Sequence, residues 1–302
     1  MKGIILAGGS GTRLYPSTLS LCKQLLPIYD KPMIYYPLSV LMLAHIREIL
    51  IISTPRDISR FKELFKNGEW LGIRIEYCVQ EKPDGLAQGL ILADKFVGND
   101  TIALILGDNI FYGQGFTHIL LTSKDEIQND KNIYLHNGEV DCGAILFSYR
   151  VNNPHSFGVL EIGNDGKVLG LEEKPTNPKS NYAATGLYFY DNNAIDIAKN
   201  LKPSPRGELE ITDVNIAYLK QNRLKAKNLG RGFAWLDTGT YDSLLEAGTF
   251  VQTLELRQGY KVACIEEIAF NNGWIDESCL MQRANLLENS GYGKYIKSLL
   301  EK

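Results

Sequence analysis

The sequence predicts an α/β fold: a doubly wound, mainly parallel, Rossmann-like sheet with an inserted strand-rich subregion. The apolar segment 2–7 runs directly into a glycine-rich stretch, as a first strand runs into a loop. Apolar runs at 49–52 and 102–106 are of the kind that a parallel sheet buries on both faces. Helical patterns separate these runs, and strands that alternate with helices imply right-handed βαβ crossovers.

Apolar spacing predicts the elements of the N-terminal part in order. The expected strands are 2–7, 49–52, 74–79 and 102–106, and the expected helices are 37–45 and 86–96. The last strand ends at Gly107 and Asp108, so it delivers a glycine and a carboxylate to the edge of the sheet.

After about residue 109 the pattern becomes strand-rich. The expected strands are 144–149, 158–162, 168–173 and 187–190, and the expected helices are 209–219, 241–256 and 294–300. The polar stretch 123–141 is expected to be an exposed helix end and loop without chemistry. We expect a single domain, 1–302, with three parts. The first part ends at about 108, the second runs from about 109 to 240, and the third, from about 241 to 302, is helical and serves assembly.

Composition excludes several classes of protein. Hydrophobic residues at 44% and charged residues at 22% are ordinary for a globular chain. A net charge of −3 argues against a nucleic-acid polymer as partner, because such binders carry basic stripes. We expect no signal peptide and no membrane span, since no apolar stretch is long enough. Five cysteines without a C-x-x-C pair indicate a reducing cytoplasm.

A glycine loop follows the first expected strand, where α/β folds bind phosphates and nucleotides. Gly8, Gly9 and Gly11 let the backbone approach a ligand and turn its N–H groups toward an anion. The loop lacks the ending of a P-loop and is not G-x-G-x-x-G, so neither ATPase nor NAD binding is supported. A tight turn without a ligand is the structural alternative.

Charged residues near this loop suggest phosphate chemistry. Arg13 lies in the loop and Lys23 follows ten residues later, so two cations can converge on one triphosphate. Asp108 at a strand end is a candidate metal ligand, although a cap or turn role is nearly as common. A second carboxylate would decide between these roles, since two aspartates leave Mg²⁺ free positions for phosphate oxygens and water.

The stretches from Gly8 to Leu14, Lys23 to Pro27 and Asp30 to Met33 together resemble the signature of the nucleotide-sugar pyrophosphorylase family. The resemblance covers 1–255 and continues through 264–270, and the polar stretch 123–141 is longer than usual for the family. It implies a Mg²⁺-dependent enzyme that joins dTTP and glucose 1-phosphate into dTDP-glucose and pyrophosphate, with the strand-rich subregion holding the sugar.

The resemblance also assigns roles to residues. It implies catalytic roles for Arg13, Lys23 and Lys174, and Mg²⁺ binding by Asp108 and Asp237. Expected nucleotide contacts are Leu6, Gly8, Gly9, Gly11, Thr12, Arg13, Gln80, Pro83 and Gly85. Expected sugar-phosphate contacts are Asn109, Gly158, Glu173, Lys174, Gly186, Tyr188 and Arg206. Structural alternatives stay open: a solvated turn at 172–175, ordinary turns at Gly158 and Gly186, and a helix cap for Arg206.

Base recognition is expected at 80–87, because the amide of Gln80 can both donate to and accept from a pyrimidine edge. This segment, with 35–38, favours thymidylyl over adenylyl and uridylyl transfer. The resemblance further implies a homotetramer and feedback inhibition by a dTDP-sugar near Tyr112, Gly113 and Phe116. Rhamnose, another deoxysugar or an amino sugar remain open as end products.

The expected chemistry needs no general base. A phosphomonoester with a second pKa of about 6 is already largely dianionic at pH 7. Catalysis is therefore expected to come from positioning and electrostatic stabilisation of an in-line displacement. The alternatives are the same reaction with UTP or another hexose phosphate, or an inactive regulatory subunit that binds nucleotide sugars; joint retention of the cations and both carboxylates speaks against the latter.

Overall fold

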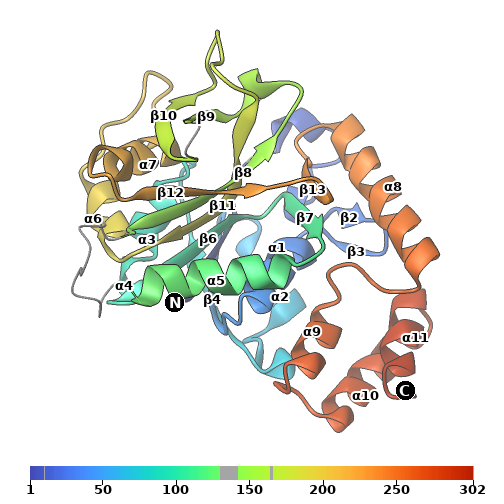
Figure 1. Cartoon of the computed structure of the whole chain (residues 1–302). Coiled ribbons are helices and arrows are strands. Elements are labelled where there is room, and N and C mark those ends of the chain that lie inside the picture. The colour runs from blue at the N-terminus through green and yellow to red at the C-terminus, as the bar shows by residue number, and fades with distance from the viewer. Residues whose placement is uncertain (10, 130–141, 164–165, 302) are drawn as a thin grey trace.

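The computed structural model describes residues 1–9, 11–129, 142–163 and 166–301 (Figure 1). A mixed sheet forms its centre, with strand order β10-β9-β11-β6-β1-β4-β5, and β8 pairs with both β11 and β12. Its strands are β1 (Lys2–Ala7), β4 (Glu48–Ser53), β5 (Arg74–Val79), β6 (Ile102–Leu106), β8 (Ala144–Arg150), β9 (Gly158–Ile162), β10 (Val168–Glu173), β11 (Tyr182–Tyr190) and β12 (Leu224–Leu229). The predicted α/β class is confirmed.

The N-terminal half of this sheet is parallel. Strand β1 lies between β4 and β6 and runs parallel to both, and β5 runs parallel to β4. Strand β11 pairs antiparallel with β6, β8 and β9, and so joins the strand-rich subregion to the parallel half. The carboxyl ends of β1, β5 and β6 therefore meet at one edge, where open α/β sheets bind ligands.

Helices cover both faces of the sheet. They are α1 (Tyr35–Leu43), α2 (Ile58–Phe65), α3 (Gln88–Leu92), α4 (Asp94–Val97), α5 (Phe116–Asn129), α6 (Asn193–Lys199), α7 (Ile211–Lys220), α8 (Tyr241–Gln258), α9 (Ile265–Asn271), α10 (Glu277–Leu286) and α11 (Gly291–Ser298). Alternation along β1 sends Ile5 into a core with α1, α2 and α5, and Ile4 into a core with α3, α4, α6 and α7. The doubly wound arrangement follows from this two-sided burial.

Short ribbons lie beyond the sheet edge. Strand β7 (Asn109–Gly113) pairs antiparallel with β13 (Phe233–Asp237), and β2 (Pro27–Ile28) pairs with β3 (Lys31–Pro32). Helix α8 packs against β2 and β13, and α9, α10 and α11 gather near the C-terminus (Figure 1). Within the described ranges, no helix is long and apolar enough to span a bilayer.

Several element boundaries differ from the sequence expectation. The helix expected at 86–96 is divided into α3 and α4 at Ala93, and the strand expected at 187–190 begins five residues earlier, at Tyr182. Residues 123–129 continue α5 and are not simply exposed, because Ser123 and Ile127 are buried. The remainder of the polar stretch, 130–141, lies outside the described residues.

Candidate active site

The glycine loop after β1 lines a cavity of about 270 Å³ at the carboxyl edge of the sheet. Gly9 and Gly11 have φ values of 105° and 60°, a region that favours glycine. A short 3₁₀ turn at Thr12–Leu14 leaves Arg13 exposed in the cavity while Leu14 anchors the turn in the core. The cavity brings together the predicted residues Gly8, Gly9, Gly11, Thr12, Arg13, Lys23, Asp108 and Asp237.

A second cavity of about 210 Å³ adjoins the first and shares Gly8, Gly9 and Asp108 with it. It brings together the predicted nucleotide contacts Leu6, Gln80, Pro83 and Gly85. The structure thus places every predicted nucleotide residue along one continuous cleft. Its two ends differ in chemistry: the first is lined by several charged side chains, and the second by apolar side chains, the amide of Gln80 and the carboxylate of Glu208.

Glycine at two of these positions has a steric cause. A Cβ on Gly8 would lie 2.7 Å from Oε1 of Gln80, so the absence of a side chain at Gly8 allows the amide of Gln80 to lie close to the loop backbone. Nε2 of Gln80 donates to Oε1 of Gln88 at 2.5 Å, which orients the amide. Gly85 has φ 109°, and a Cβ there would lie 2.3 Å from the carbonyl oxygen of Leu209.

The first carboxylate of the site is held from two sides. Asp108 follows β6, and Nζ of Lys23 lies 2.6 Å from its Oδ2. Nδ2 of Asn109 donates to its Oδ1 at 3.0 Å. Gly107 is required beside it, because a Cβ there would lie 2.8 Å from the carbonyl oxygen of Leu6.

The second carboxylate arrives on the β7–β13 ribbon, whose register places Asp237 opposite Asn109. Burial, and then the nearby charge of Asp108, raise the pKa of Asp237 from 3.8 to about 6, while Lys23, Arg13 and Lys174 act in the opposite direction. Like charges held together in a half-buried cleft form a natural cation site. The two carboxylates fit Mg²⁺, which takes one or two of them and keeps its other positions for water and phosphate oxygens.

In the described part of the chain, no group of three or more His, Cys, Asp or Glu side chains forms a denser metal site. Asp108 and Asp237, the carboxylate pair that we expected, both line the first cavity, and their binding of a metal stays a prediction.

Four of the seven predicted sugar-phosphate residues, Gly158, Glu173, Lys174 and Arg206, lie together, and none of the four lines either cavity. Oε2 of Glu173 accepts from Oγ1 of Thr212 at 2.6 Å, and its Oε1 lies 3.5 Å from both Nζ of Lys174 and Nη2 of Arg206. Arg206 also lies 2.8 Å from Glu210. A Cβ on Gly158 would approach Oε2 of Glu173 to 3.4 Å, so this glycine leaves space beside the carboxylate.

Other predicted sugar contacts lie beneath the surface. Tyr188 is buried against Tyr190, and burial raises the pKa of its phenol. The amide of Asn109 is buried, and the backbone N–H of Gly186 donates to its Oδ1 at 3.0 Å. A Cβ on Gly186 would lie 2.6 Å from that oxygen, so the glycine makes room for Asn109. Direct contact of these three residues with a sugar stays a prediction.

Sequence reasoning missed residues that line the cleft. Gln24 borders both cavities, and Sγ of Cys22 donates to its Oε1 at 2.9 Å. Glu208 borders the second cavity and Gly239 the first. Gln24 could have been found, since it follows Lys23 directly in the same motif. Cys22 itself is buried, which raises the pKa of its thiol to about 12 and keeps it protonated at neutral pH.

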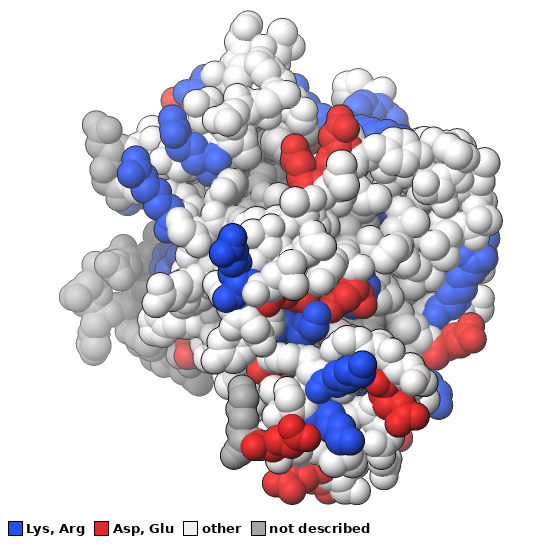
Figure 2. All heavy atoms as spheres, turned by 90° about the vertical axis from the view of Figure 1, so that its right-hand side faces the viewer, with Lys and Arg blue, Asp and Glu red and all other residues white. Residues whose placement is uncertain are grey.

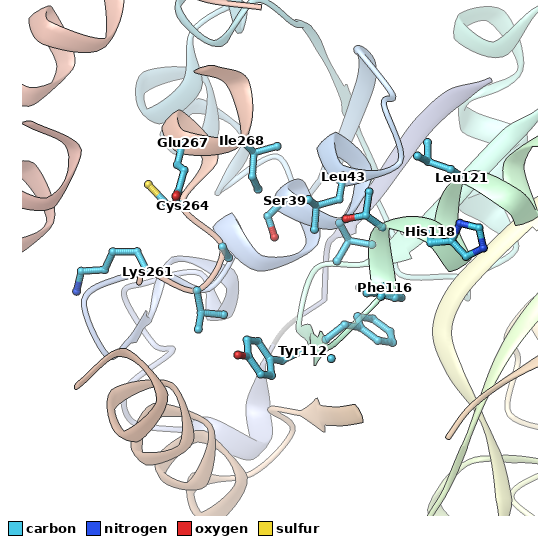
Figure 3. A pocket seen from close by; sticks show the side chains of 17 residues that line it. Ser39, Leu43, Tyr112, Phe116, His118, Leu121, Lys261, Cys264, Glu267 and Ile268 are labelled. Atoms are coloured by element: carbon cyan, nitrogen blue, oxygen red, sulfur yellow. The ribbon is translucent and has the colours of Figure 1, made fainter. Parts of the chain in front are cut away.

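A separate cavity of about 620 Å³ shares no lining residue with this cleft. Its lining comes from α1, β7, the start of α5 and the segment 261–268, and Figure 3 shows Tyr112, His118 and Lys261 around it. Tyr112, Gly113 and Phe116, which the sequence placed near a second ligand site, all line this cavity.

The fold and the cleft together define an α/β enzyme of nucleotide chemistry, with a glycine loop, converging cations and paired aspartates at strand ends. The model of the Nucleotidyl transferase family matches residues 2–253. The chain belongs to this family, as the sequence signature indicated.

Curated relatives match along the full chain. A glucose-1-phosphate thymidylyltransferase of Mycobacterium tuberculosis is 55% identical over 302 residues, and one of Neisseria meningitidis is 54% identical; each match covers 100% of both chains. A Bacillus anthracis structure described as such an enzyme is 41% identical, with a TM-score of 0.73, covering 83% of this chain and 94% of that one. A UDP-glucose pyrophosphorylase structure, 24% identical with a TM-score of 0.70, shares the fold.

Proposed function

We propose that the chain transfers a thymidylyl group from dTTP to glucose 1-phosphate, giving dTDP-glucose and pyrophosphate. The observation that carries the proposal is the continuous cleft, in which Lys23, Asp108 and Asp237 lie next to the cavity that Gln80 borders. The sequence identity of 54–55% to curated glucose-1-phosphate thymidylyltransferases, which extends over the full length of the chain, supports the choice of nucleotide and sugar.

In this reaction an oxygen of the sugar phosphate attacks the α-phosphorus of dTTP. A new P–O bond forms, the bond to the β-phosphate oxygen breaks, and pyrophosphate leaves with that electron pair. The attacking phosphate is largely dianionic at pH 7, so no side chain has to remove a proton. The chain must instead bring two polyanions together, which requires positioning and charge neutralisation.

The nucleotide end of the cleft supplies the first part of this charge neutralisation. Arg13 is exposed to the cavity, and its guanidinium can neutralise the α-phosphate and the departing pyrophosphate. Lys23 holds the triphosphate while it orients Asp108 at 2.6 Å. Mg²⁺ bound by Asp108 and Asp237 would supply further positive charge at the phosphates.

The sugar end supplies the second part. We assign Lys174 to the sugar phosphate and Glu173 to the sugar hydroxyls, because the two charged groups lie 3.5 Å apart and the charge of Lys174 acts on Asp237 in the cleft. Arg206 stands within 3.6 Å of Glu173, Glu208 and Glu210, and Glu208 borders the second cavity, so these carboxylates hold the guanidinium beside the cleft. The incoming anion competes with them for Arg206.

We further propose that nucleotide binding falls to residues 1–108, sugar binding to 109–240 and assembly to 241–302. Assembly as a homotetramer is supported by exposed apolar side chains on α8, where Leu245 and Leu256 are 72% and 71% exposed. On the face shown in Figure 2, charges of both signs are interspersed with broad uncharged areas. No disulfide joins any of the five cysteines in the described part of the chain, and thiols of this kind are typical of proteins in a reducing cytoplasm, which is the location we propose.

We include feedback inhibition in the proposal. The 620 Å³ cavity is large enough for a nucleotide sugar, and it combines an aromatic wall at Tyr112 and Phe116 with Lys261, whose ammonium pairs with Asp30 and Glu255. A dTDP-deoxysugar such as dTDP-rhamnose is the ligand we assign to it. Inhibition of the enzyme by that compound, relieved in Tyr112→Ala without loss of uninhibited turnover, is the expected result; Tyr112 is the variant of choice because it is only partly buried, whereas Phe116 belongs to the core.

The test of the main proposal is product analysis with purified protein, Mg²⁺ and glucose 1-phosphate, with dTTP, UTP, ATP, CTP and GTP supplied separately. We expect dTDP-glucose and pyrophosphate in equal amounts from dTTP, and much slower turnover with the other nucleotides. Faster turnover with UTP would assign the enzyme to a different nucleotide. No turnover with any nucleotide and several hexose 1-phosphates would support the regulatory-subunit alternative.

A further inference from the structure

The side-chain amide of Asn109 is held in one orientation beneath the cleft. Its Oδ1 accepts from the backbone N–H of Gly186 at 3.0 Å and from the indole Nε1–H of Trp235 at 2.6 Å. Both partners are groups that only donate, so the amide cannot flip without losing both bonds. The opposite end, Nδ2, is thereby aimed at Asp108 and donates to its Oδ1 at 3.0 Å.

The indole that fixes this amide is itself fixed by packing. The ring of Trp235 lies 5.0 Å from that of Phe157 and 6.0 Å from that of Tyr149, centroid to centroid. The hydroxyl of Tyr149, on β8, donates at 3.1 Å to the backbone carbonyl of Phe233, which lies on β13 together with Trp235. The indole therefore has a fixed position from which its N–H meets Asn109.

Strand β13 links this arrangement to the second carboxylate. Trp235 and Asp237 are two residues apart on it, so their side chains leave the same face of the β7–β13 ribbon. The register pairs Asp237 with Asn109 across that ribbon. One short strand therefore delivers one carboxylate directly and orients the other through an amide.

We propose that Trp235 is a positioning residue for the paired carboxylates: through Asn109, its indole N–H sets the orientation of Asp108 and so the cation affinity of the site. The inference rests on the proposed Mg²⁺ site. Asn109 occupies Oδ1 of Asp108 and Lys23 occupies Oδ2, so the carboxylate cannot rotate freely. Loss of the direct hydrogen-bond partner of a metal ligand typically weakens metal binding about 10- to 100-fold, and Asn109 is that partner here; we expect the loss of Trp235, which orients Asn109, to act at the lower end of this range.

The test uses Mn²⁺ as the probe, because carboxylates and water suit Mn²⁺ and Mg²⁺ alike. Mn²⁺ binding to the purified full chain is measured by electron paramagnetic resonance, without nucleotide, in wild type and in Trp235→Phe. The phenyl ring keeps the packing against Phe157 and removes the N–H. We expect Mn²⁺ to bind about tenfold more weakly to Trp235→Phe, with an unfolding temperature near that of wild type.

Trp70→Phe is the matched control, since the indole of Trp70 also donates one hydrogen bond, to the carbonyl of Phe65 at 3.0 Å, away from the cleft. Its Mn²⁺ affinity should equal that of wild type. Asn109→Ala removes the middle of the chain of hydrogen bonds and should weaken Mn²⁺ at least as much as Trp235→Phe. It therefore serves as the test variant where Trp235→Phe does not fold.

The possible results separate the inference from the proposal beneath it. Equal Mn²⁺ affinity in wild type, Trp235→Phe and Asn109→Ala would overturn the positioning role and leave the metal site standing. The metal site, and the inference with it, would be overturned if the wild-type protein bound no Mn²⁺, or if the Asp237→Asn variant bound Mn²⁺ as tightly as wild type does.

Discussion

Removal of one carboxylate should make the metal-free protein more stable while it abolishes metal-dependent turnover. The substitution is Asp237→Asn. Burial and the charge of Asp108 raise the pKa of Asp237 from 3.8 to about 6. At about 1.4 kcal/mol per pKa unit, ionised Asp237 costs the folded protein about 3 kcal/mol at pH 8, and an uncharged amide of similar shape removes that cost.

The pH dependence of this gain has a definite sign. Because the pKa is raised in the folded state, the cost is present in full above about pH 6 and is lost as the pH falls through 6 toward 3.8. The stabilisation of Asp237→Asn over wild type should therefore shrink to about half at pH 5. For a chain of this size, 3 kcal/mol corresponds to a rise of about 6 °C in the unfolding temperature at pH 8.

The assay is thermal and denaturant unfolding in EDTA at pH 8 and pH 5. Asp196→Asn is the control, because Asp196 is 80% exposed on α6 and its replacement should change stability little. Added Mg²⁺ should stabilise wild type but not Asp237→Asn. Two results would show that ionised Asp237 does not destabilise the folded state. Asp237→Asn would be no more stable than wild type at pH 8, or its stability advantage over wild type would grow as the pH falls.

Three further substitutions probe the cleft. Lys23→Met should lower kcat about 10²-fold or more in a pyrophosphate-release assay with unchanged circular dichroism, since it removes a charge next to the phosphates. Gln80→Ala should raise the KM for dTTP roughly tenfold and affect kcat less, as steady-state kinetics will show. Gly85→Ala should cost more than about 2 kcal/mol in urea unfolding because its Cβ meets Leu209, whereas Gly273→Ala, at φ 67° in open space, should cost about 1 kcal/mol.

Much of the fold could be predicted because its core strands carry local signals. Strands β1, β5, β6, β9 and β10 begin and end at the predicted residues. Their apolar or alternating patterns are set by burial on one or both faces of the sheet. The β7–β13 ribbon was missed, since its short strands carry no comparable pattern and are positioned by long-range packing. The break at Ala93 between α3 and α4 left no Gly or Pro in the sequence to mark it.

The site was only partly accessible from residues alone. The loop at 8–11 and Asp108 are marked by their place at strand ends, which is a local feature. Asp237 reaches the cleft from a distant segment and the charge of Lys174 acts on it, but only the family resemblance connected these two residues to the glycine loop. Trp235 could not be found at all, because its importance lies in one long-range hydrogen bond to Asn109.

The role of the paired carboxylates is tested most directly by the Mg²⁺ dependence of dTDP-glucose formation from dTTP and glucose 1-phosphate, compared among wild type, Asp108→Asn and Asp237→Asn. We predict rapid, Mg²⁺-dependent formation by wild type and a loss of at least about 10³-fold in both variants, although the metal-free Asp237→Asn protein is the more stable one. Turnover by either variant at a rate near that of wild type would contradict the assignment of the paired carboxylates as the centre of the reaction.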